Sequence, residues 1–179
     1  GIVALKGLGG FHLVVDATND DAVRRLRHKK ARDEKPFAVM APDEKSAEKY
    51  GQLSEQERLL LESPESPIVL LAKKENKSNL SAYIAPNNPM LGLMLPYTPL
   101  HHILLQKLNR PIVATSGNLA DETICTDNTN ALSRLGHIAD YFLVHNRDIR
   151  LRSDDSIVRR CAGKTRFVRR SRGYVPVPV

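Results

Sequence analysis

Apolar residues occur along this chain mostly in runs of four to six, and residues that favour turns separate these runs. Short apolar runs bounded by Gly, Pro, Asn or Asp are typical of buried β-strands. The pattern predicts strands over residues 2–5, 11–16, 36–41, 67–72, 90–95, 112–115, 141–144, 156–161 and 165–169.

A second pattern, with apolar residues three or four positions apart, predicts helices. It covers residues 18–30, 43–50, 54–62, 99–108 and 129–135. Ser54 and Glu57 have the spacing of a capping box. In the helix over 99–108, we expect one buried face made of Leu100, Ile103, Leu104 and Leu108.

The alternation of strands and helices predicts an α/β fold, a mixed sheet with helices on its faces. The sheet is expected to be mixed because several strands follow one another as closely as in hairpins. Polar stretches over 73–82 and 119–128 are expected to be loops.

The composition fits one domain that binds an anionic partner. The chain has 179 residues, 41% of them hydrophobic, which is enough for one sizeable core. The net charge is +7, and arginines crowd residues 147–172. Such an excess favours a nucleotide, a nucleic acid or an acidic protein surface, although a solvated basic face is the simpler interpretation.

Cysteine usage and hydropathy indicate a cytoplasmic setting. The two cysteines, Cys125 and Cys161, are far apart, so neither a zinc site nor a disulfide framework is indicated. No apolar run has membrane-spanning length, and we expect no membrane partner. The chain opens inside a predicted strand without Met and ends in Pro-Val-Pro-Val. We therefore expect an excised piece of a longer polypeptide, with one domain over 1–175 and a linker over 176–179.

Basic residues at a helix end form the first candidate site. Lys30 and Arg32 follow the helix over 18–30, and Lys35 precedes Pro36. Cations at a helix C-terminus can simply complement the helix dipole. Because Pro36 redirects the chain, Arg32 and Lys35 could instead project over a sheet edge and hold phosphate oxygens.

Small polar residues after a strand form the second candidate site. Ser116 and Asn118 flank Gly117 directly after the strand over 112–115, where open α/β sheets bind ligands. Their hydroxyl and amide groups can bond phosphate or carboxylate oxygens, or can simply form a turn. Arg147 follows another predicted strand, so it is also expected near a strand end where a ligand could bind.

Three further motifs have weaker functional signals. The segment from Lys6 to Gly10 lacks the end of a Walker loop, so a tight glycine turn is favoured, although Lys6 could reach an anion. His101-His102 has no HExxH context, which favours surface capping over metal binding. Asp154-Asp155 could orient Mg²⁺ or pair with arginines; we expect no dedicated metal ligands.

Several segments in order resemble a known domain. They are KGLGGFHL from Lys6, KARDEKPFAVM from Lys30, MLPYTPLH from Met94, TSGN from Thr115, HNRDI from His145, RSDDS from Arg152 and RRSRGYVP from Arg169. Together they resemble the YrdC-like domain of HypF-type carbamoyltransferases, which help to mature [NiFe]-hydrogenases. The likeness covers essentially the whole chain, and it implies a twisted sheet with a basic concave surface.

The resemblance implies a function in cyanide-ligand synthesis. In HypF, this domain joins carbamate to ATP, giving carbamoyl-adenylate and pyrophosphate, and another domain passes the carbamoyl group to the C-terminal cysteine of HypE. The family's KxR and SxN motifs fall on Lys30/Arg32 and Ser116/Asn118. The first glycine turn departs from that of the threonylcarbamoyl-adenylate synthases, which makes threonine a poor candidate substrate. Because the family's domain normally has a helix before its first strand, we expect this chain to be trimmed at its start.

From the resemblance, we expect Lys30, Arg32, Ser116 and Asn118 to act in catalysis. Lys35, Arg147 and Arg170 would complete the site for ATP and Mg²⁺, and Lys6 would contact the carbamoyl end. Some YrdC-type proteins bind double-stranded RNA, so a non-enzymatic RNA-binding module is the alternative; it predicts steep salt dependence and little need for Ser116.

Overall fold

The computed structural model describes residues 1–74, 78–119 and 122–177 of the chain. Within them the strands are β1 (Val3–Lys6), β2 (Phe11–Asp16), β3 (Ala38–Met40), β4 (Ile68–Ala72), β5 (Met90–Met94), β6 (Ile112–Ser116), β7 (Tyr141–Leu143), β8 (Ile157–Cys161) and β9 (Lys164–Arg169). The helices are α1 (Asp20–Lys29), α2 (Glu44–Ala47), α3 (Glu55–Glu62), α4 (Pro99–Leu108) and α5 (Asn128–Leu135), with a 3-10 turn η1 (Ala82–Ile84).

These elements confirm the α/β prediction, and each predicted strand and helix is present within a few residues of its expected bounds. The predicted loops over 73–82 and 119–128 and the predicted linker include residues 75–77, 120–121 and 178–179, which lie outside the described residues.

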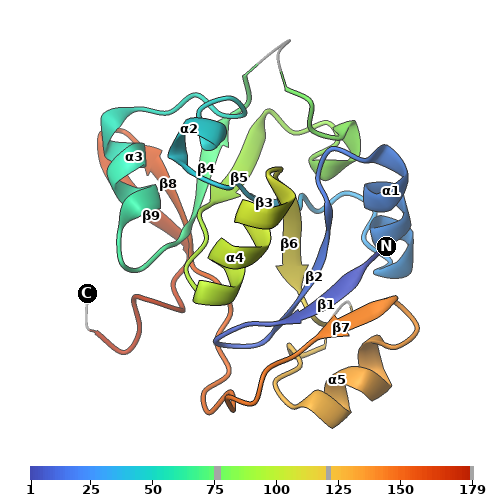
Figure 1. The fold of residues 1–179 in the computed structure, drawn as a ribbon. Helices are drawn as coiled ribbons and strands as arrows, with labels where there is room; N and C mark the ends of the chain where they lie inside the picture. Colours follow the sequence, from blue (N-terminus) through green and yellow to red (C-terminus); the bar gives the residue numbers. More distant parts are fainter. Residues whose placement is uncertain (75–77, 120–121, 178–179) are drawn as a thin grey trace.

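The strands form one mixed sheet of nine strands in the order β7-β1-β2-β6-β3-β5-β4-β8-β9 (Figure 1). Strand β6 lies in the interior of the sheet and pairs antiparallel with both β2 and β3. Strands β3 and β5 run parallel, as do β4 and β8. The sheet is mixed because hairpins such as β1–β2 give antiparallel pairs, whereas longer crossover connections give the parallel pairs.

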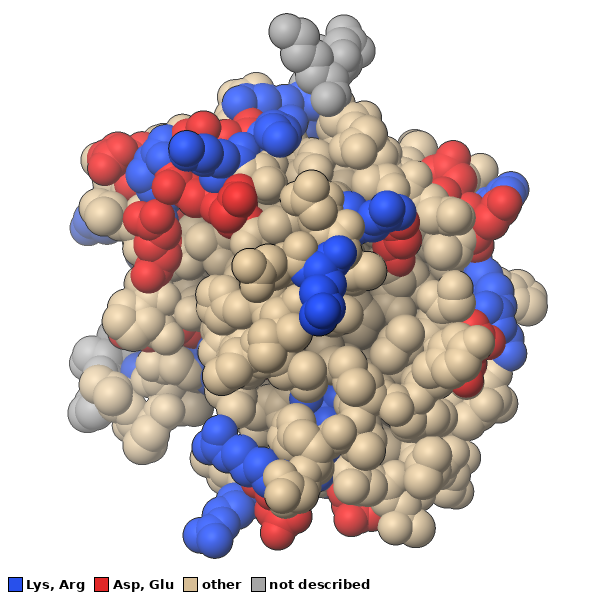
Figure 2. Space-filling model, in the orientation of Figure 1, with Lys and Arg blue, Asp and Glu red and all other residues tan. Residues whose placement is uncertain are grey.

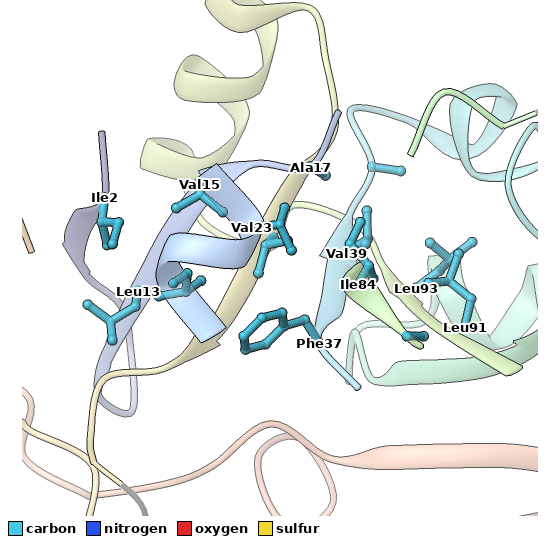
Figure 3. Close-up of a cluster of buried hydrophobic side chains, with 14 of the residues drawn as sticks. Ile2, Leu13, Val15, Ala17, Val23, Phe37, Val39, Ile84, Leu91 and Leu93 are labelled. Atoms are coloured by element: carbon cyan, nitrogen blue, oxygen red, sulfur yellow. The ribbon is translucent and has the colours of Figure 1, made fainter. Parts of the chain in front are cut away.

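Alternation along the strands divides the core between the two faces of the sheet. One face packs against α1, η1, α2, α3 and α5, and includes Leu13, Val23, Phe37 and Ile84. Figure 3 shows these side chains meeting between α1 and the strands. The other face carries a smaller cluster that includes Val14, Met40 and Ile112 and packs against α4.

Helix α4 has the predicted bounds but not the predicted buried face. Its fully buried residues are His101 and Leu105, and Leu100 and Leu104 pack beside them. Ile103 is 54% exposed and Leu108 39% exposed, so the expected face was wrong for these two residues. The helix covers only part of its sheet face, which leaves the flank that carries Ile103 in solvent.

Local signals at the helix ends and turns behave as the sequence predicts. Ser54 and Glu57 form the capping box of α3. The turn after β1 is closed by Gly7, whose N–H donates to the carbonyl of Gly10 at 2.9 Å, as a tight glycine turn requires. Its glycines are needed for close packing rather than for positive φ: a Cβ on Gly9 would lie 2.3 Å from the carbonyl oxygen of Ser153.

Candidate functional site

A cavity of about 460 Å³ lies on the sheet face that carries α4, beyond the part that the helix covers. Its floor comes from six adjacent strands, whose side chains on this face line it. They are His12 of β2, Ala114 and Ser116 of β6, Ala38 of β3, Met90 and Gly92 of β5, Ile68 and Leu70 of β4, and Ile157 and Arg159 of β8.

The hollow exists because the middle of this floor is made of very small residues. Ala38 lies opposite Ala114 on one neighbouring strand and opposite Gly92 on the other. Larger side chains stand on both sides: His12 lies opposite Ser116, and Leu70 lies opposite Arg159. Since none of the helices in the described part of the chain lines these positions, the missing side-chain volume becomes a cavity instead of closing into a packed core.

Cationic side chains surround the cavity. Arg32, Lys35, Arg159 and Arg169 all line it. Arg32 is fixed by donating from Nε to the carbonyl of Lys35 at 2.9 Å and from its terminal nitrogens to Thr115 Oγ1 at 3.0 Å and to the carbonyl of Pro36. Burial lowers the pKa of Arg32 to about 10, and nearby arginines act in the same direction. It remains a cation at neutral pH, so the cavity favours an anion.

Lys30 lies behind this wall and holds the loop after β6. Its ammonium donates to the carbonyls of Ser116 and Asn118 at 2.7 and 2.6 Å, and to Asn118 Oδ1 at 3.3 Å. The residue is only 4% exposed. Burial lowers its pKa to about 7, with further repulsion from Arg32 and Lys35. Lys30 is thus placed to position Ser116 and Asn118, and it does not line the cavity.

The loop itself is tightly held. Ser116 Oγ donates to Asn118 Oδ1 at 2.6 Å, and Asn118 Nδ2 donates to the carbonyl of Glu122 at 2.6 Å. Between them, the N–H of Gly117 donates to the carbonyl of Phe11 at 2.6 Å, and a Cβ at this position would lie 2.7 Å from the same oxygen. Only glycine allows this approach, so the SxN spacing has a structural reason at its middle residue.

At the β2 end, a buried network closes the cavity. Asp155 lies 3.1 Å from His12 Nε2, accepts from Arg172 Nε at 2.9 Å and accepts from the Tyr97 hydroxyl at 3.2 Å. Burial alone would raise the pKa of Asp155, but His12 and Arg172 hold it well below its usual range. Of the two alternatives for this carboxylate, the structure shows pairing with an arginine.

His101 belongs to the same buried region. Its ring meets Tyr97 edge-on at 4.6 Å and stacks 6.0 Å from His12. It is 0% exposed, so the expected surface capping role was wrong for His101, although His102 is exposed. Burial, with repulsion from His12, lowers the pKa of His101 to about 3. It therefore stays neutral at physiological pH.

The structure does not bring all the predicted site residues together. Lys6 donates to the carbonyl of His145 at 3.2 Å and lines a separate cavity of about 170 Å³ beside Asp127 and Asp148. Arg147 lines another cavity, with Leu8, Asp148, Arg150 and Leu151. Arg170 donates to the carbonyls of Tyr174 and Val177. None of these three lines the central cavity with Arg32.

Several lining residues, among them Arg169 and His12, were not among the predicted site residues. Arg169 ends β9 opposite Ile157 and lines the cavity, whereas its neighbour Arg170 does not. Successive residues of a strand point to opposite faces, so an error of one position selects the wrong arginine. His12 was missed because it stands alone in an apolar strand; its shared parity with buried Val14 gave no hint of an open cavity.

Charge does not form one basic patch on the face that carries α4. On the face that carries α4, Figure 2 shows a largely uncharged centre, with acidic and basic side chains mixed over α2 and α3. Among the described residues, no cluster of three or more His, Cys, Asp or Glu side chains could hold a metal ion. None of the helices in the same residues is long and apolar enough to cross a membrane.

Comparisons with known proteins give the chain its relatives. The sequence profile of the Sua5/YciO/YrdC family, described as "Telomere recombination", matches residues 1–171. Carbamoyltransferase HypF of Synechocystis sp. is 54% identical over 178 residues, covering 99% of this chain and 23% of that protein. Probable carbamoyltransferase HypF of Methanocaldococcus jannaschii is 41% identical, with 99% and 23% covered. The chain thus spans about a quarter of the length of these relatives.

Solved structures agree with these matches. Full-length HypF in the phosphate- and nucleotide-bound form has 51% identity and a TM-score of 0.94, over 98% of this chain and 28% of that one. T. kodakarensis HypF has 42% identity and a TM-score of 0.96, over 99% and 23%. P. abyssi Sua5 complexed with L-threonine has a TM-score of 0.82 over 95% of this chain and 50% of that one; at 16% identity, it supports the fold alone.

Proposed function

This chain belongs to the Sua5/YciO/YrdC family, and from this premise we propose that it joins carbamate to ATP, giving carbamoyl-adenylate and pyrophosphate. Its high identity to HypF carbamoyltransferases supports the carbamoyl chemistry. The observation that carries the proposal is the convergence of Arg32, Lys35 and Ser116 on one cavity, with Lys30 fixing the loop behind them.

The cavity suits a nucleotide in its size and in the order of its lining. Apolar side chains of β4 and β5, among them Ile68, Leu70 and Met90, offer a floor for a flat base. Arg32 and Lys35 lie nearer β6, where phosphate oxygens would find a bidentate fork and a point charge. Pockets that bind small molecules combine an apolar lining with a few fixed polar groups in this way.

In the proposed reaction, a carbamate oxygen attacks the α-phosphorus of ATP. One P–O bond forms to carbamate, the bond to the bridging oxygen breaks, and pyrophosphate leaves with its electron pair. The two reactants are both anions, so Arg32 and Lys35 lower the repulsion between them and stabilise charge on the phosphate oxygens. Ser116, held by Lys30 and Asn118, presents its side chain to the same space.

The residues present fit Mg²⁺ only as a partner of the triphosphate. Asp155 is already used by Arg172, Tyr97 and His12, whereas the neighbouring Asp154 also lines the cavity. Nucleotide-bound Mg²⁺ needs only one or two protein carboxylates, and Asp154 would supply one. When bound, the ion would neutralise charge on the phosphates of ATP.

In a longer protein of the HypF type, we propose that other domains supply carbamate and pass the carbamoyl group to the C-terminal cysteine of HypE, in the cytoplasm. The alternative, an RNA-binding module based on the C-terminal arginines, is not favoured. Two of its arginines are committed elsewhere, since Arg172 pairs with Asp155 and Arg170 bonds backbone carbonyls, and Arg159 and Arg169 line the cavity instead.

Calorimetric titration of ATP into Lys35→Ala and Ser116→Ala variants tests the site. Lys35 is exposed, so its removal leaves the fold intact. Loss of one charge-assisted contact is expected to weaken ATP binding roughly 10- to 100-fold. Lys45→Ala, an exposed lysine on α2, is the matched control and should bind ATP as the unmodified chain does.

Carbamate-dependent exchange between ATP and labelled pyrophosphate tests the reaction itself. The unmodified chain should catalyse exchange only when carbamate is present, and both variants should be slower. ATP affinity unchanged in both variants would exclude this cavity as the nucleotide site. ATP binding without any exchange would leave a nucleotide-binding domain and overturn the adenylation step.

A further inference from the structure

The proposed reaction leaves unexplained the buried network at the β2 end of the cavity. Arg172 anchors this network: besides Asp155, it donates to the carbonyls of Glu65 and Ser66 at 3.1 and 2.8 Å, and its guanidinium lies 3.7 Å from the ring centre of Tyr97. The carboxylate of Asp155 thus contacts three side chains, those of Arg172, Tyr97 and His12. Such a network keeps His12 in one orientation, because its Nε2 is 3.1 Å from the same carboxylate.

His12 has direct access to the site. It lines the cavity and lies opposite Ser116 in the antiparallel pair of β2 and β6, so the two side chains are neighbours on one face. His12 is only 5% exposed, and its Nδ1 is buried with no hydrogen-bond partner among residues 1–74, 78–119 and 122–177. A buried ring nitrogen without a partner is costly, and an N–H donor brought by a ligand would satisfy it.

The position of this network restricts what can bind there. His12 lies on β2, whereas the apolar floor that suits a base lies on β4 and β5. Four strand spacings separate β2 from β4 in the sheet, or about 19 Å. The base therefore does not suit this end of the cavity.

We propose that His12, positioned by Asp155, contacts the small acid substrate at the Ser116 end of the cavity and selects an acid that carries N–H donors. This assignment rests on the proposed function. Carbamate has both of the features required: a carboxylate for Arg32 and Ser116, and an amino group whose N–H bonds need acceptors. His12 Nδ1 supplies an acceptor in a site whose other polar groups are mainly donors.

Acetate is the discriminating competitor, because it has the same carboxylate but a methyl group in place of the amino group. A site built to hydrogen-bond an N–H rejects an analogue that lacks it, since buried acceptors would stay unpaired. The unmodified chain should therefore prefer carbamate to acetate strongly in ATP–pyrophosphate exchange, and His12 should carry much of that preference.

The test variant is His12→Gln, whose amide nitrogen can still donate to Asp155 while the Nδ1 acceptor is lost. We expect the KM for carbamate to rise roughly 10- to 100-fold, with ATP affinity within about twofold of the unmodified chain. Preference for carbamate over acetate should fall by a similar factor. His102→Gln is the matched control, because His102 is an exposed histidine on α4. It should change neither the KM for carbamate nor the affinity for ATP.

Each outcome separates this assignment from the proposed function. Unmodified chain that shows no carbamate-dependent exchange would refute the reaction. Normal exchange with an unchanged carbamate KM and preference in His12→Gln would refute the role of His12 alone. Loss of ATP affinity in His12→Gln, with carbamate KM unchanged, would place the adenine amino group at this wall and overturn the assignment.

Discussion

Lys30 shows how burial changes what one side chain contributes. A lysine at a helix end usually complements the helix dipole in solvent, but here the ammonium is enclosed and donates to three oxygens of the loop after β6. Its pKa falls from 10.5 to about 7 because burial disfavours the charged form. The protein therefore maintains a costly charge to position Ser116 and Asn118.

This cost makes stability depend on pH. Between pH 7 and 10.5, the unfolded chain holds a proton on Lys30 that the folded chain has released, so the free energy of unfolding should rise with pH in this window. The steepest rise that one group can give is about 1.4 kcal/mol per pH unit. Lys30→Met should remove its part of the rise, as urea unfolding at pH 7 and pH 9.5 would show.

Lys45→Met provides the control, because this exposed lysine on α2 should leave the pH dependence unchanged. A Lys30→Met variant that gains as much stability between pH 7 and 9.5 as the unmodified chain would contradict the assigned shift. Lower stability of Lys30→Met at both pH values is expected, since three loop oxygens lose their donor.

At the scale of elements, α4 shows the difference between forming a helix and orienting it. Thr98 caps its first turn by accepting from the N–H of His101 at 3.0 Å, and Pro99 begins it, so its start is encoded locally. Its buried side is decided by the sheet beneath. His101 and Leu105 face inward, while Ile103 stays in solvent.

Two substitutions measure this orientation. Leu105→Ala should lower the free energy of unfolding by about 2–5 kcal/mol, because a buried side chain leaves a cavity. Ile103→Ala should change it by less than about 0.5 kcal/mol, since the side chain is already half in solvent. Chemical denaturation of both variants measures these changes. Equal losses of unfolding free energy would indicate that Ile103 is buried, as the sequence pattern predicted.

At the scale of the whole molecule, the cavity results from how far α4 extends and from three small residues on neighbouring strands. Ala38 lies at the centre of that group, between Ala114 and Gly92. Ala38→Leu should fill the hollow and weaken ATP binding by more than roughly tenfold, because the added atoms occupy ligand space. Stability should change by less than about 1 kcal/mol, since the added side chain enters open space.

Calorimetry with ATP and thermal unfolding would measure both effects. Ala82→Leu is the matched control: this exposed alanine lies in η1, which packs on the opposite face of the sheet. It should bind ATP normally. Undiminished ATP affinity in Ala38→Leu would move the nucleotide site away from this cavity.

The sequence by itself determined the elements and their ends. Apolar runs, the capping box of Ser54 and Glu57, and the glycine turn at Gly7 are local features, fixed by hydrogen bonds between residues close in the chain. Local order also singled out Arg32, Lys35 and Ser116, because a turn or strand end projects them from the sheet. For each of these features, residues close together in the sequence carried enough information for the prediction.

Only the tertiary structure decided which side chains share the cavity. The pairing of His12 with Asp155 joins residues 143 positions apart, and its partner Arg172 comes from the far end of the chain. Choice of Arg169 over Arg170 depends on the register of β9, and the separate positions of Lys6 and Arg147 depend on where loops pack. These contacts arise from packing between distant segments, which local patterns of polarity do not encode.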